Sequence, residues 1–301
     1  MVTSRFAPAP TGFLHLGHVV NAIYVWGITR SLGGRVLLRI EDHDKQRSRP
    51  EYERAILDDL DWLGFVPDEP ETGAFRTGRC AGRQSDRSAL YEASLQRLRS
   101  AGFVYACECS RSDILSAATS SGDEISYPGT CARKNLLERS GVGIRVRLAA
   151  STEQFVDLRH GAIEQRPFEQ CGDLLARDRE GNWTYQFAVA VDDFEQGVTH
   201  VIRGDDLLTS TGRQIQLARL LGRSVPPHFF HHPLIMKSAT QKLSKADRDT
   251  SVRDLRAAGM RPGDVVGRAA AAAGLIPTPR PVDASEAGSL VSRFVPAQRS
   301  V

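Results

Sequence analysis

Long hydrophobic runs and a strong net charge are both missing from this sequence. No apolar segment approaches the roughly 20 residues that a membrane-spanning helix needs, and the N-terminus lacks the apolar core and cleavage site of a secretory signal. We therefore expect no membrane partner and a cytoplasmic protein. Lys and Arg outnumber Asp and Glu only by 39 to 36, so no basic tail indicates a nucleic-acid partner. Binding a polyanion would require a local basic surface.

A disulfide framework is also missing, because the five cysteines are odd in number and three of them crowd into residues 107–131. Such usage favours a reducing compartment and a metal site. The three are Cys107, Cys109 and Cys131. Three thiolates suit zinc, but a closed structural site needs a fourth ligand, and no histidine lies in the surrounding segment. Buried free thiols remain an alternative, and Cys80 and Cys171 have no partner motif.

Strand and helix patterns alternate through the first hundred residues. Residues 2–7 and 35–40 have the apolar character of strands, and residues 18–32, 50–63 and 88–100 have helical spacing. Alternation of this kind is typical of a parallel sheet with helices on its faces. We therefore predict an α/β fold with a Rossmann-like, doubly wound parallel sheet.

The alternation of strand and helix patterns ends near Val104 and begins again at Gly143. After Gly143 we predict a strand, a hairpin, a buried strand and two helices, over residues 144–148, 154–163, 188–191, 207–221 and 264–273. The chain would then divide into a first half of the main α/β domain, a small insertion with the cysteines, a second half of the main domain, and a short helical tail whose end we expect to be partly disordered. These parts are residues 1–104, 105–142, 143–247 and 248–301.

Two histidines, His15 and His18, stand where the first strand is predicted to turn into a helix. Gly17 between them lets a ligand approach the backbone closely. The N-terminus of a helix offers free N–H groups and a positive dipole end to phosphate. A proline-rich turn with two surface histidines is the alternative interpretation of this motif.

A second motif, Lys242-Leu243-Ser244-Lys245, lies far downstream. Two ammonium groups three residues apart can stabilise a pyrophosphate leaving group as its charge develops. Taken alone, a pair of solvated surface lysines would explain this motif equally well.

Together the two motifs resemble the paired signatures of class I aminoacyl-tRNA synthetases. Residues 15–18 are similar to the HIGH signature and residues 242–245 to the KMSKS signature, in the same order and at a similar separation. Leu16, Leu243 and Ala246 depart from the family pattern, but both histidines and both lysines remain. The resemblance implies that ATP, accompanied by Mg²⁺, binds at His15, Gly17, His18 and Lys245, and that the catalytic groups are His15, His18, Lys242 and Lys245.

Other segments look like those of glutamyl-type enzymes, among them Arg5-Phe6-Ala7-Pro8, Arg39-Ile40-Glu41-Asp42 and Val201-Ile202-Arg203-Gly204. A dicarboxylic amino acid needs a guanidinium for its side-chain carboxylate and an acidic group for its ammonium. The alternative is an ordinary surface ion-pair network around Arg39 and Glu41. The resemblance implies that Arg5 and Arg203 bind the carboxylate and Glu41 the amino group. The implied L-glutamate site comprises Arg5, Ala7, Ala9, Glu41, Tyr185 and Arg203.

The closer resemblance is to short paralogues of glutamyl-tRNA synthetase, the glutamyl-queuosine tRNA(Asp) synthetases. Few residues follow Lys245, fewer than the anticodon-binding domains of full-length enzymes occupy. The short enzymes usually carry a zinc insertion with three cysteines and a tyrosine. For this chain that implies one structural Zn²⁺ per chain, held by Cys107, Cys109, Tyr127 and Cys131.

The implied reaction is activation of glutamate with ATP and its transfer to queuosine in the anticodon stem-loop of tRNA(Asp), without charging of the 3′ end. Arg111, Arg133 and Arg213 are candidates for the RNA-binding surface. One alternative is a truncated glutamyl-tRNA synthetase that charges tRNA(Glu). Others are a non-catalytic RNA-binding paralogue and a nucleotidylyltransferase with a similar histidine turn.

Overall fold

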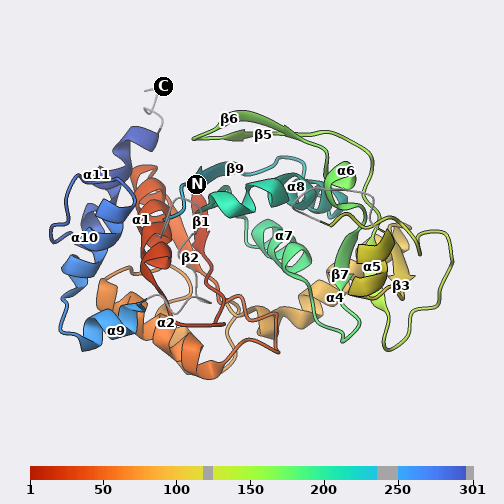
Figure 1. The fold of residues 1–301 in the computed structure, drawn as a ribbon, viewed down its shortest axis with the longest axis horizontal. Helices are drawn as coiled ribbons and strands as arrows, with labels where there is room; N and C mark the ends of the chain where they lie inside the picture. The colour runs from red at the N-terminus through yellow and green to blue at the C-terminus, as the bar shows by residue number, and fades with distance from the viewer. Residues whose placement is uncertain (118–124, 236–249, 296–301) are drawn as a thin grey trace.

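The computed structural model describes residues 1–117, 125–235 and 250–295. Strands and helices are mixed throughout, as expected for an α/β protein. Among the described residues, none of the helices combines the length and the apolar character that a membrane span requires. The helices that follow residue 250 lie at one end of the long axis, and the cysteine-bearing segment lies at the other (Figure 1).

Parallel strands from distant parts of the chain form the centre of the molecule. Strand β1 (Thr3–Phe6) pairs in parallel with β2 (Arg35–Leu38), and β8 (His200–Gly204) pairs in parallel with β9 (His228–His232). The N–H of Thr199 donates to the carbonyl of Thr3 at 2.9 Å, so β8 begins beside β1. The carboxyl ends of these strands carry the residues that sequence patterns single out.

The remaining strands add antiparallel pairing, so that one sheet is mixed and another is purely antiparallel. Strand β5 (Glu153–Asp157) touches β9 in parallel at one position and pairs along its length with antiparallel β6 (Gly161–Gln165), which confirms the predicted hairpin. A separate antiparallel sheet lies toward the cysteine-bearing end. Its strands are β3 (Val104–Cys107), β4 (Gly143–Val146) and β7 (Leu174–Arg177).

Helix α1 (Leu16–Ser31) is the most deeply buried helix of the N-terminal half, because it packs between the strands and the helices of the tail. Helices α10 (Pro262–Ala272) and α11 (Ala287–Val291) both contact it (Figure 1). The helix predicted over residues 264–273 is therefore confirmed as α10. The side chain of Val291 is fully buried, and the half-buried Phe294 and Val295 pack against the same core.

Apolar spacing correctly predicted several other helices. Helix α2 (Pro50–Leu63) ends at Gly64, which has a left-handed φ of 81°, and α4 (Ser88–Ser100) covers the antiparallel sheet. Shorter helices complete the fold: α3 (Thr72–Arg76), α5 (Arg111–Ala117), α6 (Pro167–Cys171) and α9 (Val252–Ala257).

The strand predicted over residues 188–191 is wrong, because this segment lies inside helix α7 (Tyr185–Glu195). All residues from Phe187 to Asp193 are buried, so the helix shows no polar face and its short apolar run cannot be told from a buried strand. The helix predicted over residues 207–221 begins later, as α8 (Thr211–Leu220), after a turn of 3₁₀ helix.

Close contact between α1 and α11 depends on Gly27. A Cβ atom at this position would lie 2.6 Å from the carbonyl oxygen of Ala287 and 2.6 Å from Cγ2 of Val291. A methyl group there must push the helices apart, whereas a Cβ at Gly73 in α3 would meet nothing within 4 Å.

We expect Gly27→Ala to lower the free energy of unfolding by about 1–3 kcal/mol, since overpacking outweighs the better helix propensity of alanine. Urea unfolding followed by circular dichroism measures the change. Gly73→Ala is the matched control and should be neutral or stabilising by up to about 1 kcal/mol. Equal stability of the two variants would contradict close packing of α11 on α1.

Candidate active site

One cavity of about 350 Å³ lies where the carboxyl ends of β1 and β8 meet the start of α7. Parallel strands deliver the residues that follow them to the same edge of a sheet, and ligands bind in such crevices. Every residue predicted to bind glutamate lines this cavity: Arg5, Ala7, Ala9, Glu41, Tyr185 and Arg203. They come from four segments that are far apart in sequence.

A buried cluster of charges supports the floor of the cavity. Asp193 of α7 accepts hydrogen bonds from Arg5 Nε at 3.0 Å and Arg39 Nη1 at 2.7 Å, both to Oδ1. Arg39, which is wholly buried, also donates from Nη2 to Glu41 Oε1 at 3.0 Å. The alternative of a surface ion-pair network is therefore wrong, because the Arg39–Glu41 pair lies in the interior.

The pKa of Asp193 reflects this environment. Burial alone would raise the pKa of its carboxyl group, but the adjacent Arg5 and Arg39 outweigh burial and lower that pKa to about 2. The sequence shows the Asp192-Asp193 pair within an apolar run, yet pattern reasoning gave neither residue a structural role. Two acidic residues within a hydrophobic segment could have indicated a buried ion-pair cluster, since buried carboxylates require partners.

Arg203 is held differently from Arg5. Its Nε donates to His231 Nε2 at 3.0 Å, its Nη1 donates to Gln214 Oε1 at 2.7 Å, and its Nη2 donates to Thr211 Oγ1 at 2.8 Å. Burial lowers the pKa of the Arg203 guanidinium, although Tyr185 opposes this. Burial likewise raises the pKa of the Tyr185 phenol, so that the hydroxyl stays protonated.

The two histidines of the first motif begin helix α1, as predicted. His15 is the N-cap residue, and its Nδ1 accepts from the N–H of Gly17, while Nδ1 of His18 accepts from the N–H of His15, each at 3.1 Å. An Nδ1 that accepts a hydrogen bond carries no proton, so Nε2–H is the donor of each neutral ring.

A second cavity of about 350 Å³ surrounds this helix start and is lined by His15, Gly17 and His18. His18, Asn21, Gly204 and Leu207 line both cavities. The two cavities are therefore adjacent, and the positive end of the α1 dipole faces the second one.

Lys242 and Lys245, predicted to be catalytic, lie outside the described residues. The chain is described again from Thr250, and Ser251 forms a β-bridge with His15. The N–H of Val252 also donates to the carbonyl of Leu14 at 2.8 Å. Backbone hydrogen bonds thus connect the segment that follows the lysine motif to the histidine motif.

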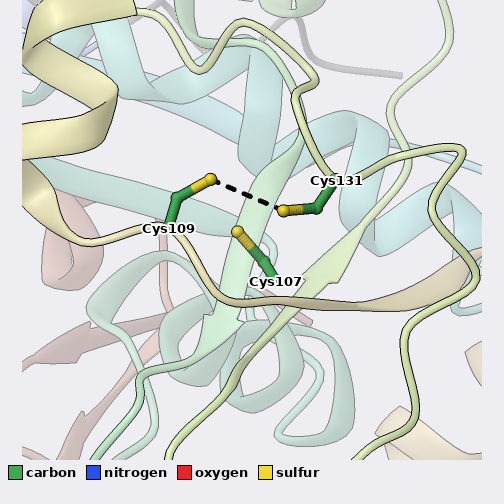
Figure 2. A group of neighbouring side chains, drawn as sticks. All are labelled: Cys107, Cys109 and Cys131. Atoms are coloured by element: carbon green, nitrogen blue, oxygen red, sulfur yellow. Dashed lines mark hydrogen bonds between the residues drawn. The ribbon is translucent and has the colours of Figure 1, made fainter.

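The sulfur atoms of Cys107, Cys109 and Cys131 point toward one another (Figure 2) and all lie within 4.8 Å. Tetrahedral zinc with Zn–S bonds of about 2.3 Å requires sulfur atoms about 3.8 Å apart, which this cluster can satisfy. Burial and the neighbouring thiol of Cys131 raise the pKa of Cys109 to about 11, as expected when thiols are crowded together.

Tyr127 supplies an oxygen atom at this cluster. The Cys107 thiol lies 3.4 Å from the Tyr127 hydroxyl, which also accepts the N–H of Cys131 at 2.9 Å. The Arg145 guanidinium stacks 3.5 Å above the phenol ring. Three sulfur atoms and one oxygen atom are therefore together, as predicted, whereas Cys80 and Cys171 are not part of the group.

A larger cavity of about 760 Å³ extends from the cysteine cluster to Tyr185 and Gln186 of α7. Of the three arginines predicted to bind RNA, Arg111 and Arg213 line this cavity and Arg133 does not. Tyr185 lines both this cavity and the one that holds Arg5.

Comparison with known proteins agrees with this geometry. Residues 1–266 match the family model described as tRNA synthetases class I (E and Q), catalytic domain. A protein of Rhodobacter capsulatus named Glutamyl-Q tRNA(Asp) synthetase is 41% identical over 88% of this chain and 98% of its own length. A protein of the same name from Symbiobacterium thermophilum is 41% identical over 95% of this chain and 91% of its own.

Among solved structures, a glutamate tRNA ligase from Elizabethkingia meningosepticum in complex with its amino acid superposes with a TM-score of 0.76. It is 27% identical, and the match covers 95% of this chain but 64% of that one. The chain belongs to the glutamyl-Q tRNA(Asp) synthetases, a family within the class I tRNA synthetases of the E and Q type.

Proposed function

We propose that this chain activates L-glutamate with ATP and transfers it to the queuosine base in the anticodon loop of tRNA(Asp), leaving the 3′ end uncharged. The observation that carries the proposal is the adjacency of the cavities. The cavity with Arg5, Glu41 and Arg203 opens beside the cavity with the histidine motif. The names of the relatives support the choice of acceptor.

The first step joins the two small substrates. The α-carboxylate of glutamate attacks the α-phosphorus of ATP, so that a mixed anhydride forms and pyrophosphate leaves. In the second step a hydroxyl group of the acceptor nucleoside attacks the activated carbonyl, an ester forms and AMP leaves. No protein nucleophile is required, and positioning and electrostatic stabilisation provide the rate enhancement.

Within the first cavity, Arg5 and Arg203 bind the side-chain carboxylate of glutamate and Glu41 binds its ammonium group. Tyr185 lies beside the arginines on the cavity wall, and the small side chains of Ala7 and Ala9 leave room for the amino acid. The buried Asp193 neutralises part of the charge of Arg5 and holds it in place.

In the second cavity, the Nε2–H groups of His15 and His18 and the backbone at Gly17 face the phosphates of ATP. Lys242 and Lys245 stabilise the developing pyrophosphate, and Mg²⁺ accompanies ATP. The β-bridge between Ser251 and His15 supports this arrangement. Lys245 precedes Ser251 by only a few residues, so the chain length keeps it near the histidine motif.

We further infer that β2, β1, β8 and β9 form the core of a Rossmann-like, doubly wound sheet, interrupted by an insertion over residues 105–142. One structural Zn²⁺, held by Cys107, Cys109, Tyr127 and Cys131, stiffens this insertion where it borders the large cavity. That cavity, with Arg111 and Arg213 on its wall, is the site we assign to the anticodon loop.

Arg203→Ala should raise the KM for glutamate in ATP–pyrophosphate exchange by at least about 100-fold, because a substrate carboxylate is left without its buried cation. The KM for ATP should change little. Arg166→Ala removes an exposed arginine and is the control. An unchanged KM for glutamate in the Arg203 variant would remove this residue from the glutamate site.

Protein prepared without chelators should contain close to one zinc per chain by elemental analysis. Cys109→Ser should lower the zinc content and the thermal stability, since structural zinc contributes folding free energy. Cys171→Ser, which changes a thiol outside the cluster, should leave both unchanged. Tyr127→Phe tests the oxygen ligand alone and should weaken zinc retention against a chelator. Wild-type protein free of zinc would contradict the metal site.

Labelled glutamate should be transferred to tRNA(Asp) that carries queuosine and not to the unmodified transcript. Removal of the 3′-terminal adenosine should leave this transfer intact, because the acceptor lies in the anticodon loop. Charging of full-length tRNA(Glu), lost when its terminal adenosine is removed, would overturn the acceptor while leaving glutamate activation in place.

A further inference from the structure

We propose that His231 is a positioning residue that fixes the guanidinium of Arg203 for the glutamate carboxylate; this inference rests on the proposed glutamate site. His231 lies directly opposite Arg203 in the parallel register of β8 and β9. It is fully buried and lines none of the cavities described above, so it acts on substrate only through another residue.

The hydrogen bonds of His231 define its tautomer. Asp157 Oδ2 lies 2.7 Å from His231 Nδ1 and also accepts the backbone N–H of His231 at 3.0 Å. Nδ1 therefore carries the proton, and the lone pair of Nε2 accepts from Arg203 Nε at 3.0 Å. Burial lowers the pKa of His231, which favours this neutral ring.

The result is a line of buried groups in the order Asp157, His231, Arg203, each at most 3% exposed. Arg203 is fixed at its other nitrogen atoms by Gln214 and Thr211. These partners of Arg203 are all electrically neutral. Within the described part of the chain, no carboxylate is close enough to form an ion pair with Arg203, in contrast to Arg5, which is paired with Asp193.

A neutral imidazole suits this task better than a carboxylate would. A carboxylate in direct contact with Arg203 would satisfy its charge and compete with the carboxylate of the substrate. The imidazole orients the planar guanidinium through Nε and leaves the positive charge available to the cavity, while Asp157 is kept one ring away. Arg203 is thus oriented by a neutral histidine, whereas the charge of Arg5 is partly neutralised by Asp193.

Two conservative variants separate orientation from packing. His231→Gln keeps an acceptor near the position of Nε2, whereas His231→Asn keeps polar atoms only near Nδ1. In ATP–pyrophosphate exchange, we expect His231→Asn to raise the KM for glutamate about tenfold, since a hydrogen bond to a charged group is lost. The KM for ATP and kcat should stay within about threefold, and His231→Gln should stay close to wild type. His200→Asn, a change on β8 near the other end of the same strand pair, is the control.

A double-mutant cycle with Arg203→Ala completes the test and remains informative if one of the two conservative variants fails to fold. The effect of changing His231 should vanish when Arg203 is absent. Equal losses in the Asn and Gln variants, or parallel losses in the KM for ATP and in kcat, would overturn the positioning role in favour of a structural one. If Arg203→Ala leaves the KM for glutamate unchanged, the proposed glutamate site itself fails; if only the His231 variants are silent, the site stands and this inference alone is wrong.

Discussion

The contact on which the proposed glutamate site most depends is the one between Asp193 and its two arginines. Arg5 arrives from β1, Arg39 follows β2, and Asp193 belongs to α7, so this single carboxylate joins the first strands of the chain to a helix more than 150 residues away. The free-energy cost of burying these charges is offset only while all of them are present. Loss of one partner would leave an uncompensated charge beneath the cavity.

Asp192, the preceding residue, extends the same support toward the surface. Its carboxylate accepts from Gln84 Nε2 at 2.8 Å, Tyr91 Oη at 2.8 Å and Arg87 Nε at 2.7 Å. Asp193 thus holds Arg5 and Arg39 in place. Asp192 holds the segment that leads into α4, and its Oδ2 also lies 3.8 Å from Arg39 Nε. A rigid base of this kind limits the movement of Arg5 and Glu41, which any orientation-based catalysis requires.

The sequence correctly predicted which residues lie together in the cavity, but it did not predict the residues that hold them in place. Arg5, Glu41 and Arg203 stand in segments that resemble a family, and the structure brings all of them to one cavity. The sequence around His231 does not predict that it contacts Arg203, because Arg203 lies on another strand and the two residues become neighbours only in the folded sheet.

Helix α7 shows the same limit at the level of secondary structure. Its apolar residues are buried on every side, so the periodicity that reveals helices such as α2 is missing, and a strand was predicted instead. The cysteine cluster is the opposite case. Spacing and residue type suffice for a metal-site hypothesis, and the structure adds the approach of Tyr127 to Cys107.

The arrangement of the cavities also constrains how the two reaction steps follow one another. Tyr185 and Gln186 form the first turn of α7, and Tyr185 lines both the proposed glutamate cavity and the large cavity beside the cysteine cluster. The activated carbonyl must be reached from the acceptor side without release of the adenylate, because an exposed mixed anhydride would be hydrolysed. In the proposed reaction, a shared wall at Tyr185 would allow the acceptor nucleoside to approach from the large cavity while ATP occupies the histidine side.

Hydrogen bonds connect that wall to Arg203, the arginine that we propose binds glutamate. Gln186 Oε1 accepts from Gln214 Nε2 at 2.8 Å, and Gln214 Oε1 in turn accepts from Arg203 at 2.7 Å. The orientation of each amide group is fixed by its neighbour, since one end must donate and the other must accept. Gln186, which lines the large cavity, and Arg203, which lines the proposed glutamate cavity, therefore belong to one polar network. A shift of either side chain would change the hydrogen bonds of the other.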